Sequence, residues 1–150
     1  MKDPDSIQED LSTFFSSQRL AVLATHDKGQ PYTSLVAFLS SKDLKNIYFA
    51  TTRATRKYAN LMTDPRVSML IDNRSNEMTD FRSSMAVTAT GNAEEVEGSD
   101  WDRLFQMYIA RHPNLEEFVS SPTCALLRIR VEKYYVVTRF QNVEEVSVKP

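Results

Sequence analysis

Hydrophobic residues recur along the chain with two different periods, and the change of period separates predicted helices from predicted strands. Near the N-terminus, Ile7, Leu11, Phe14 and Phe15 recur at helical spacing. Ser6–Glu9 has the form of a capping box at the start of this run. The first element is therefore expected to be an amphipathic helix.

Six later runs have the apolar, β-branched and aromatic content that is typical of strands. They cover residues 20–25, 32–39, 46–51, 66–72, 85–91 and 123–138. His26–Gln30 supplies the turn chemistry of a hairpin between the first two runs. Gly91 suggests a β-bulge. The pattern predicts five or six strands that begin as an antiparallel meander.

Helical spacing returns twice between the strands. Ala54, Tyr58, Leu61 and Met62 share one face of a short helix that ends at Asp64–Pro65. A longer apolar stripe predicts a second helix, packed in the core or against a partner: Trp101, Leu104, Phe105, Tyr108 and Ile109. Residues 73–83 are predicted to form a loop. Short helices between strands, without βαβ alternation, favour a mainly β (α+β) barrel over a doubly wound sheet.

Composition narrows the function classes. A chain of 150 residues that is 41% hydrophobic is expected to form one domain over residues 1–150. A single cysteine, Cys124, and the lack of an apolar signal segment after Met1–Asp5 favour a cytoplasmic location. A net charge of -2 and the absence of a long apolar run predict binding neither to nucleic acid nor to a membrane.

Missing motifs exclude several chemistries. The two histidines, His26 and His112, and the single cysteine do not form a spaced zinc cluster, so no metal site is predicted. Only three glycines are present, and neither a Rossmann fingerprint nor a Walker loop can be written with them. No nucleophile elbow occurs, and no catalytic residue can be named from the sequence.

One cluster of phosphate-binding groups remains, at Thr51–Lys57, where a predicted strand turns into a predicted helix. Free backbone N–H groups and the positive end of the helix dipole favour an anion at such a place. Threonine hydroxyls and the Arg and Lys side chains can donate charge-assisted hydrogen bonds to it. The cluster fits a phosphate ester, and it equally fits a solvated surface helix.

The stretch from Leu23 to Ile71 resembles the flavin-binding half of the pyridoxamine 5'-phosphate oxidase-like family. The resemblance rests on four segments in order: Gly29–Tyr32, Ala50–Thr51, Thr55–Lys57 and Asp64–Ser68. It implies a six-stranded antiparallel split β-barrel with short flanking helices. It also implies a homodimer that holds flavin mononucleotide (FMN) at its interface.

The resemblance further implies which residues contact the cofactor. These are Ser34, Leu35, Val36, Ala50, Thr51, Thr52, Arg56 and Lys57. Arg56 and Lys57 match family positions that bind the phosphate of FMN. The strand from Ser34 to Leu39 matches the segment along the flavin, where backbone contacts tolerate varied side chains.

The chain also departs from the family pattern. The true oxidase has an arginine and a lysine where this chain has Ser34 and Leu39, and residues 140–150 lack its basic, tryptophan-containing C-terminal region. The expectation is therefore a flavin-dependent oxidoreductase with an unspecified small-molecule substrate, and not a pyridoxamine 5'-phosphate oxidase. The alternative is a non-catalytic flavin, deazaflavin or haem-binding or sensing module. Its haem version rests on His112, although a histidine before Pro113 more often ends a helix.

Overall fold

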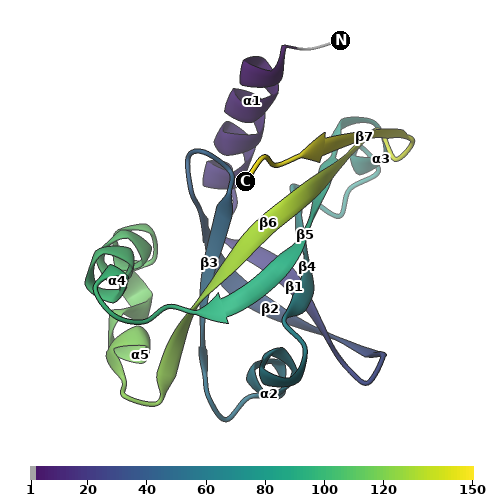
Figure 1. The fold of residues 1–150 in the computed structure, drawn as a ribbon. Helices are drawn as coiled ribbons and strands as arrows, with labels where there is room; N and C mark the ends of the chain where they lie inside the picture. The colour runs from purple at the N-terminus through teal and green to yellow at the C-terminus, as the bar shows by residue number, and fades with distance from the viewer. Residues whose placement is uncertain (1–2) are drawn as a thin grey trace.

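Seven strands and five α-helices follow one another along residues 3–150, the part of the chain that the computed structural model describes (Figure 1). Met1 and Lys2, part of the N-terminal segment interpreted above, lie outside the described residues. The strands are β1 (Leu20–Asp27), β2 (Gln30–Ser40), β3 (Asn46–Thr52), β4 (Arg66–Asp72), β5 (Met85–Glu95), β6 (Cys124–Thr138) and β7 (Asn142–Ser147). The helices are α1 (Pro4–Ser17), α2 (Arg56–Thr63), α3 (Asp80–Ser83), α4 (Asp100–Arg111) and α5 (Glu116–Ser120), with a 3₁₀ turn at Pro113–Leu115.

Six of the strands close into an antiparallel barrel. The sheet order is β3-β2-β1-β4-β5-β6-β7, and β3 also pairs with β6, which joins the two ends. The first half of β6 pairs with β3, from Thr52 opposite Cys124 to Asn46 opposite Arg130. Its second half pairs with β7 instead. The predicted six-stranded split barrel is confirmed, and β7 is an additional strand that the sequence analysis did not predict.

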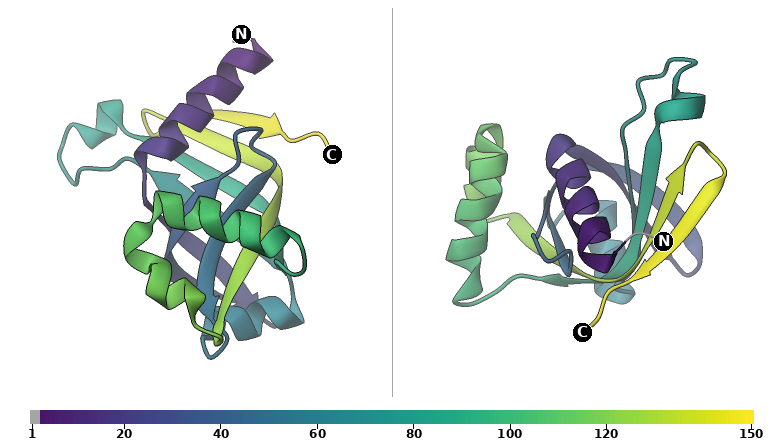
Figure 2. Two further views of the ribbon diagram at one scale, coloured as in Figure 1. Left: turned by 90° about the vertical axis from the view of Figure 1, so that its left-hand side faces the viewer. Right: turned by 90° about the horizontal axis from the view of Figure 1, so that it is seen from above.

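Alternation along the strands separates an interior from an exterior, because successive side chains of a strand point to opposite faces. On β2, Val36 and Phe38 belong to the interior cluster, and on β3 Ile47 and Phe49 do. Helix α1 lies over one mouth of the barrel (Figure 2). It contributes the ring of Phe15, which packs on those of Phe38 and Tyr134 at centroid distances of 6.4 and 5.6 Å.

A second apolar cluster lies on the outer face of β3 and β6, where α4 and α5 cover the barrel (Figures 1 and 2). Its buried members are Tyr48, Ala50, Val96, Leu104, Tyr108, Val119, Cys124 and Leu126. Leu104 and Tyr108 confirm the predicted core face of the second long helix. Trp101 and Phe105 stack on each other at 4.8 Å and pack at the edge of this cluster.

Gly91 lies at a real irregularity in the sheet. The register between β5 and β6 shifts between Thr90 and Gly91, which confirms the predicted bulge. A Cβ atom at Gly91 would collide with the backbone carbonyl of Arg130. Glycine is therefore required here by the close approach of two backbones.

Three local predictions were wrong. Ala54 precedes the N-cap Thr55 and so lies outside α2, and Met62 in the last turn is exposed, so these two do not share a buried helical face with Leu61. Helix α1 begins at Pro4 with Asp3 as its N-cap, so Ser6 lies inside the helix and not at a capping box. Residues 73–83 are not all loop, because α3 forms at Asp80–Ser83. Among the described residues, no helix has the length and apolar character needed to cross a membrane.

Candidate functional site

An open pocket of about 340 Å³ lies outside the barrel, between the strand pair β2–β3 and the helices α4–α5. We call it the outer groove. It is lined by Leu20, Leu35, Val36, Ala37, Ala50, Thr51, Thr52, Thr55, Lys57, Tyr108, Leu115 and Phe118. Most of these side chains are apolar, and the polar ones gather where β3 ends and α2 begins.

Six of the eight residues that the resemblance implied line this groove: Leu35, Val36, Ala50, Thr51, Thr52 and Lys57. Ser34 is not a lining residue, and its side chain lies on the same face of β2 as Phe38, which points into the barrel. Its Oγ is buried without a hydrogen-bond partner among residues 3–150. Any contact of Ser34 with a ligand in the groove would therefore come from its backbone.

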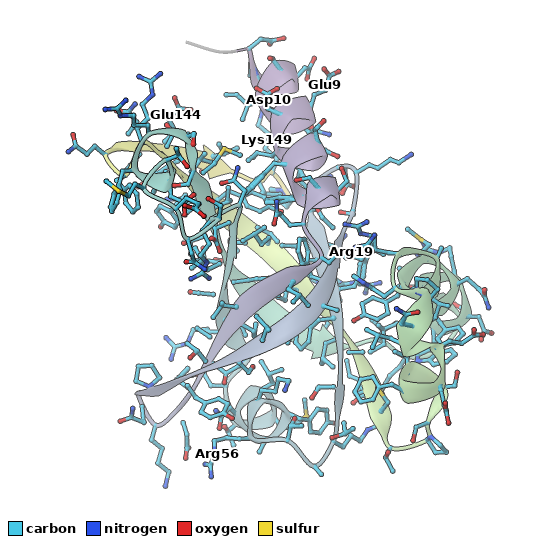
Figure 3. All side chains as sticks on the ribbon, turned by 180° about the vertical axis from the view of Figure 1, so that it is seen from behind. Glu9, Asp10, Arg19, Arg56, Glu144 and Lys149 are labelled. Atoms are coloured by element: carbon cyan, nitrogen blue, oxygen red, sulfur yellow. The ribbon has the colours of Figure 1, made fainter. Side chains whose placement is uncertain are left out.

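Arg56 also stays outside the groove lining. It is exposed at the first position of α2, and Figure 3 shows it at the foot of the molecule, apart from the side that carries α4 and α5. A phosphate at the start of α2 would still lie near it, because α2 begins at the end of the groove. The structure places Lys57, and not Arg56, inside the groove.

Hydroxyl groups organise the start of α2. Thr55 is the N-cap, and its Oγ1 accepts a hydrogen bond from the backbone N–H of Tyr58 at 3.3 Å. The same hydroxyl lies 2.8 Å from Thr51 Oγ1 and donates to the carbonyl of Thr52 at 3.0 Å. The amides of Arg56 and Lys57 belong to the first helical turn, where N–H groups have no acceptor inside the helix. These amides can bind an anion.

The cations of this region fall into two groups. Arg53 is engaged, because its guanidinium contacts Glu95 at 2.8 Å. Among residues 3–150, neither Arg56 nor Lys57 forms an ion pair with a protein carboxylate. Lys57 is partly buried, and this burial lowers the pKa of its ammonium group. A partly buried cation without a counter-ion is stabilised by an anionic ligand.

His112, on which the haem alternative rests, and two arginines of β6 have structural partners. Nε2 of His112 lies 2.7 Å from the carbonyl oxygen of Phe38, and His112 is the C-cap of α4. Burial lowers the pKa of this imidazole, so its neutral form is favoured. Arg128 and Arg130 both contact Glu94, at 3.3 and 2.7 Å. These histidine and arginine side chains hold the fold together and do not line the groove.

The groove offers little acid–base chemistry of its own. Of the residues that line it, only Lys57 and Tyr108 carry an ionisable side chain. The hydroxyl of Tyr108 donates to the carbonyl of Ala37 at 2.9 Å, and burial raises the pKa of this phenol. Within residues 3–150, no group of three or more His, Cys, Asp or Glu side chains could hold a metal ion.

Several residues of the groove were not identified as site residues from the sequence. Tyr108, Leu115 and Phe118 come from the α4–α5 region, more than fifty residues after Lys57 in the chain, and no motif marks them. Leu20 and Ala37 are ordinary strand residues by pattern. Thr55 could have been identified from the sequence, because it lies within the cluster of phosphate-binding groups at Thr51–Lys57.

A family model described as pyridoxamine 5'-phosphate oxidase matches residues 7–138 of the chain. No curated protein matches it. Among solved structures, a heme binding protein from Mycobacterium smegmatis has a TM-score of 0.83 with 21% identity, covering 98% of this chain and 59% of that one. The chain thus spans about three fifths of that relative's length.

Two further solved structures match over nearly their whole length. HutZ, a heme storage protein from Vibrio cholerae, has a TM-score of 0.74 with 19% identity, covering 87% of this chain and 92% of its own. An FAD-binding protein from Mesorhizobium loti has a TM-score of 0.68 with 19% identity, covering 85% and 90%. At these identities the likeness to solved structures establishes the fold alone.

Proposed function

This chain belongs to the pyridoxamine 5'-phosphate oxidase family, and on that premise we propose that it binds FMN in the outer groove as a flavin-dependent oxidoreductase. The observation that carries the proposal is the partly buried Lys57, which has no carboxylate partner among residues 3–150, at the polar end of an otherwise apolar groove. A phosphate ester on a planar, largely apolar ring system has the complementary distribution of charge.

The residues present fit the two parts of FMN. Lys57, the first-turn amides of α2 and the hydroxyl of Thr52 would hold the phosphate. Leu35, Ala37 and the α4–α5 side chains would cover the ring. Because Arg53 is already paired with Glu95, the charge offered to the phosphate comes from Lys57 and, at the rim, from Arg56.

A bound flavin supplies the hydride and electron chemistry itself, and the protein contributes orientation, exclusion of water and the local field. This division suits a groove in which Lys57 and Tyr108 are the ionisable lining side chains. The substrate is proposed to be a small redox-active molecule. Oxidation of pyridoxamine 5'-phosphate is not proposed, because Ser34 and Leu39 replace two cationic positions of the oxidase.

A second copy of the chain is proposed to complete the site. The groove is open, and Leu20, Leu35 and Phe118 at its edge are 53%, 64% and 41% exposed in the single chain. Exposed apolar side chains that gather around a pocket mark an interaction surface. A homodimer with FMN at its interface would cover both the open groove and the exposed apolar side chains at its edge. A cytoplasmic location remains a prediction from the sequence.

Haem binding is the second candidate, favoured by two structural neighbours, a heme binding protein and a heme storage protein. The residues of this chain favour it less. His112 is buried and held by Phe38, and His26 contacts Asp64 at 3.0 Å, away from the groove. A histidine ligand in the groove is therefore not provided by residues 3–150.

The test is an absorbance spectrum of the freshly purified protein, followed by titration with FMN. Flavin bands and saturable FMN binding are expected. Lys57→Met should weaken binding roughly tenfold or more, since a hydrogen bond to a charged group contributes about 1.5–3 kcal/mol. Arg56→Met should weaken it less, because Arg56 lies at the rim. Lys42→Met, an exposed lysine in the β2–β3 turn, is the matched control and should bind as wild type does.

Two outcomes would contradict the proposal. A featureless spectrum together with no titratable FMN binding would refute it. A Soret band in place of flavin bands would put haem first, and a band that survives His112→Ala would exclude that histidine as an obligatory ligand.

A further inference from the structure

One carboxylate on β5 joins the two sides of the turn between β3 and α2. We call residues 52–57 the phosphate turn. Oε2 of Glu95 accepts a hydrogen bond from Nη2 of Arg53 at 2.8 Å, and Oε1 accepts one from the hydroxyl of Tyr58 at 2.7 Å. Arg53 precedes the N-cap Thr55, and Tyr58 follows it. Glu95 therefore bridges the turn from one end to the other.

Arg53 extends this connection to a fourth segment. Its Nη1 donates to the carbonyl of Pro122 at 2.9 Å, and its backbone N–H donates to the carbonyl of Thr123 at 3.0 Å. The turn is thus fixed to β5 through the side chain of Arg53, and to the residues before β6 through both its side chain and its backbone. None of the residues of this network lines the outer groove: Arg53, Tyr58, Glu95, Pro122 and Thr123.

The carboxylate of Glu95 pairs with Arg53 of the phosphate turn and not with Lys57. Partial burial would raise the pKa of the Glu95 carboxyl, but the hydrogen bonds from Arg53 and Tyr58 outweigh it and lower that pKa. The carboxylate is therefore ionised and paired with Arg53 at neutral pH. Lys57, on the groove side of the turn, has no carboxylate partner among residues 3–150.

We propose that Glu95 is a positioning residue: it holds the phosphate turn in the conformation that binds the phosphate of the cofactor, acting through Arg53 and Tyr58. The inference rests on the proposed function. Glu95 touches no part of the groove, so its effect on a ligand is indirect. Preorganised binding groups gain affinity because their supporting hydrogen bonds are already formed before the ligand arrives.

A phosphate-specific readout separates positioning from general structural support. FMN and riboflavin share the ring system, but only FMN has the phosphate. Glu95→Gln should weaken FMN about tenfold, the size of effect expected when charge-assisted hydrogen bonds are lost, while riboflavin affinity changes less than about twofold. The FMN-to-riboflavin affinity ratio should therefore fall by nearly the full FMN effect.

The neighbouring residue provides a matched control. Glu94 lies on the same strand but contacts Arg128 and Arg130, away from the turn. Glu94→Gln should leave the affinity ratio unchanged. Tyr58→Phe removes only the hydroxyl that donates to Glu95, and it should lower the ratio about threefold; it keeps the test decisive if Glu95→Gln does not fold.

The possible results distinguish a failure of the positioning role of Glu95 from a failure of the proposed FMN binding. Equal weakening of FMN and riboflavin in Glu95→Gln, or an unchanged ratio in both Glu95→Gln and Tyr58→Phe, would overturn the positioning role while the proposed function stands. Wild-type protein that binds neither flavin would refute the proposed function, and with it this inference.

Discussion

The two faces of β2 differ in how completely they are covered. Phe38, which points into the barrel, is 1% exposed, and Leu35, which points into the outer groove, is 64% exposed. The interior is closed by six strands and α1, so its apolar side chains are almost completely buried. The groove leaves apolar side chains exposed and Lys57 partly exposed to water. One strand therefore stabilises the fold with one set of alternate residues and offers a ligand surface with the other.

The largest expected contrast comes from truncating one residue on each face. Phe38→Ala should lower the free energy of unfolding by about 4 kcal/mol, because it leaves a cavity in a closed core. Leu35→Ala should change it by less than about 0.5 kcal/mol but weaken FMN binding. Chemical denaturation and FMN titration of both variants measure this. Similar stability losses for the two would mean that the faces do not divide the roles.

A second contrast compares two glycines. Gly91→Ala should destabilise the barrel by roughly 3 kcal/mol, because the new methyl group meets the backbone of Arg130. Gly29→Ala, in the exposed β1–β2 turn, has a φ of +86° and free space around it, so its cost is only the roughly 1 kcal/mol of a left-handed backbone. Thermal denaturation of the pair checks the order, and the reverse order would contradict the bulge assignment.

A smaller effect is expected at Ser34. Its hydroxyl is buried without a partner among residues 3–150, so Ser34→Ala should raise the free energy of unfolding by about 1 kcal/mol. FMN affinity should stay unchanged, because only the backbone of Ser34 can face the groove. A marked loss of affinity in this variant would show that the side chain reaches the cofactor.

The smallest expected effect is a difference in acid sensitivity. The pKa of Glu95 lies below its ordinary value of 4.5 in the folded state, so its contribution to stability is present above that value and is lost as the pH falls below it. The stability difference between wild type and Glu95→Gln should therefore stay constant from pH 7 down to about 5 and shrink as the pH falls below 4.5. Urea denaturation at a series of pH values measures this difference. A difference that stays constant below pH 4.5 would contradict the pairing of the Glu95 carboxylate with Arg53.

Most strands of the barrel could be predicted from the sequence, because alternation with a period of two residues encodes which face of a strand is buried. It located six strands and the bulge at Gly91. It missed β7, whose residues Asn142–Ser147 are mostly exposed and carry little apolar signal. It also missed α3 and α5, which at four and five residues are too short for helical periodicity to appear.

The site was predicted in part for a similar reason. Local motifs identified Thr51, Thr52 and Lys57 because they lie within one strand-to-helix junction. The contribution of Tyr108 and the bridge from Glu95 to Arg53 depend on contacts between residues far apart in the chain, which no local pattern records. The inward orientation of Ser34 follows from its parity with Phe38, so the sequence did contain that information.

The central claim is that the outer groove binds FMN with its phosphate at the start of α2. A crystal structure of the protein grown with FMN tests it most directly. The account predicts the phosphate at the first turn of α2 beside Lys57, with the ring along the outer face of β2. FMN bound elsewhere, such as in the larger pocket of about 510 Å³ beside Phe81 and Phe140, would contradict it.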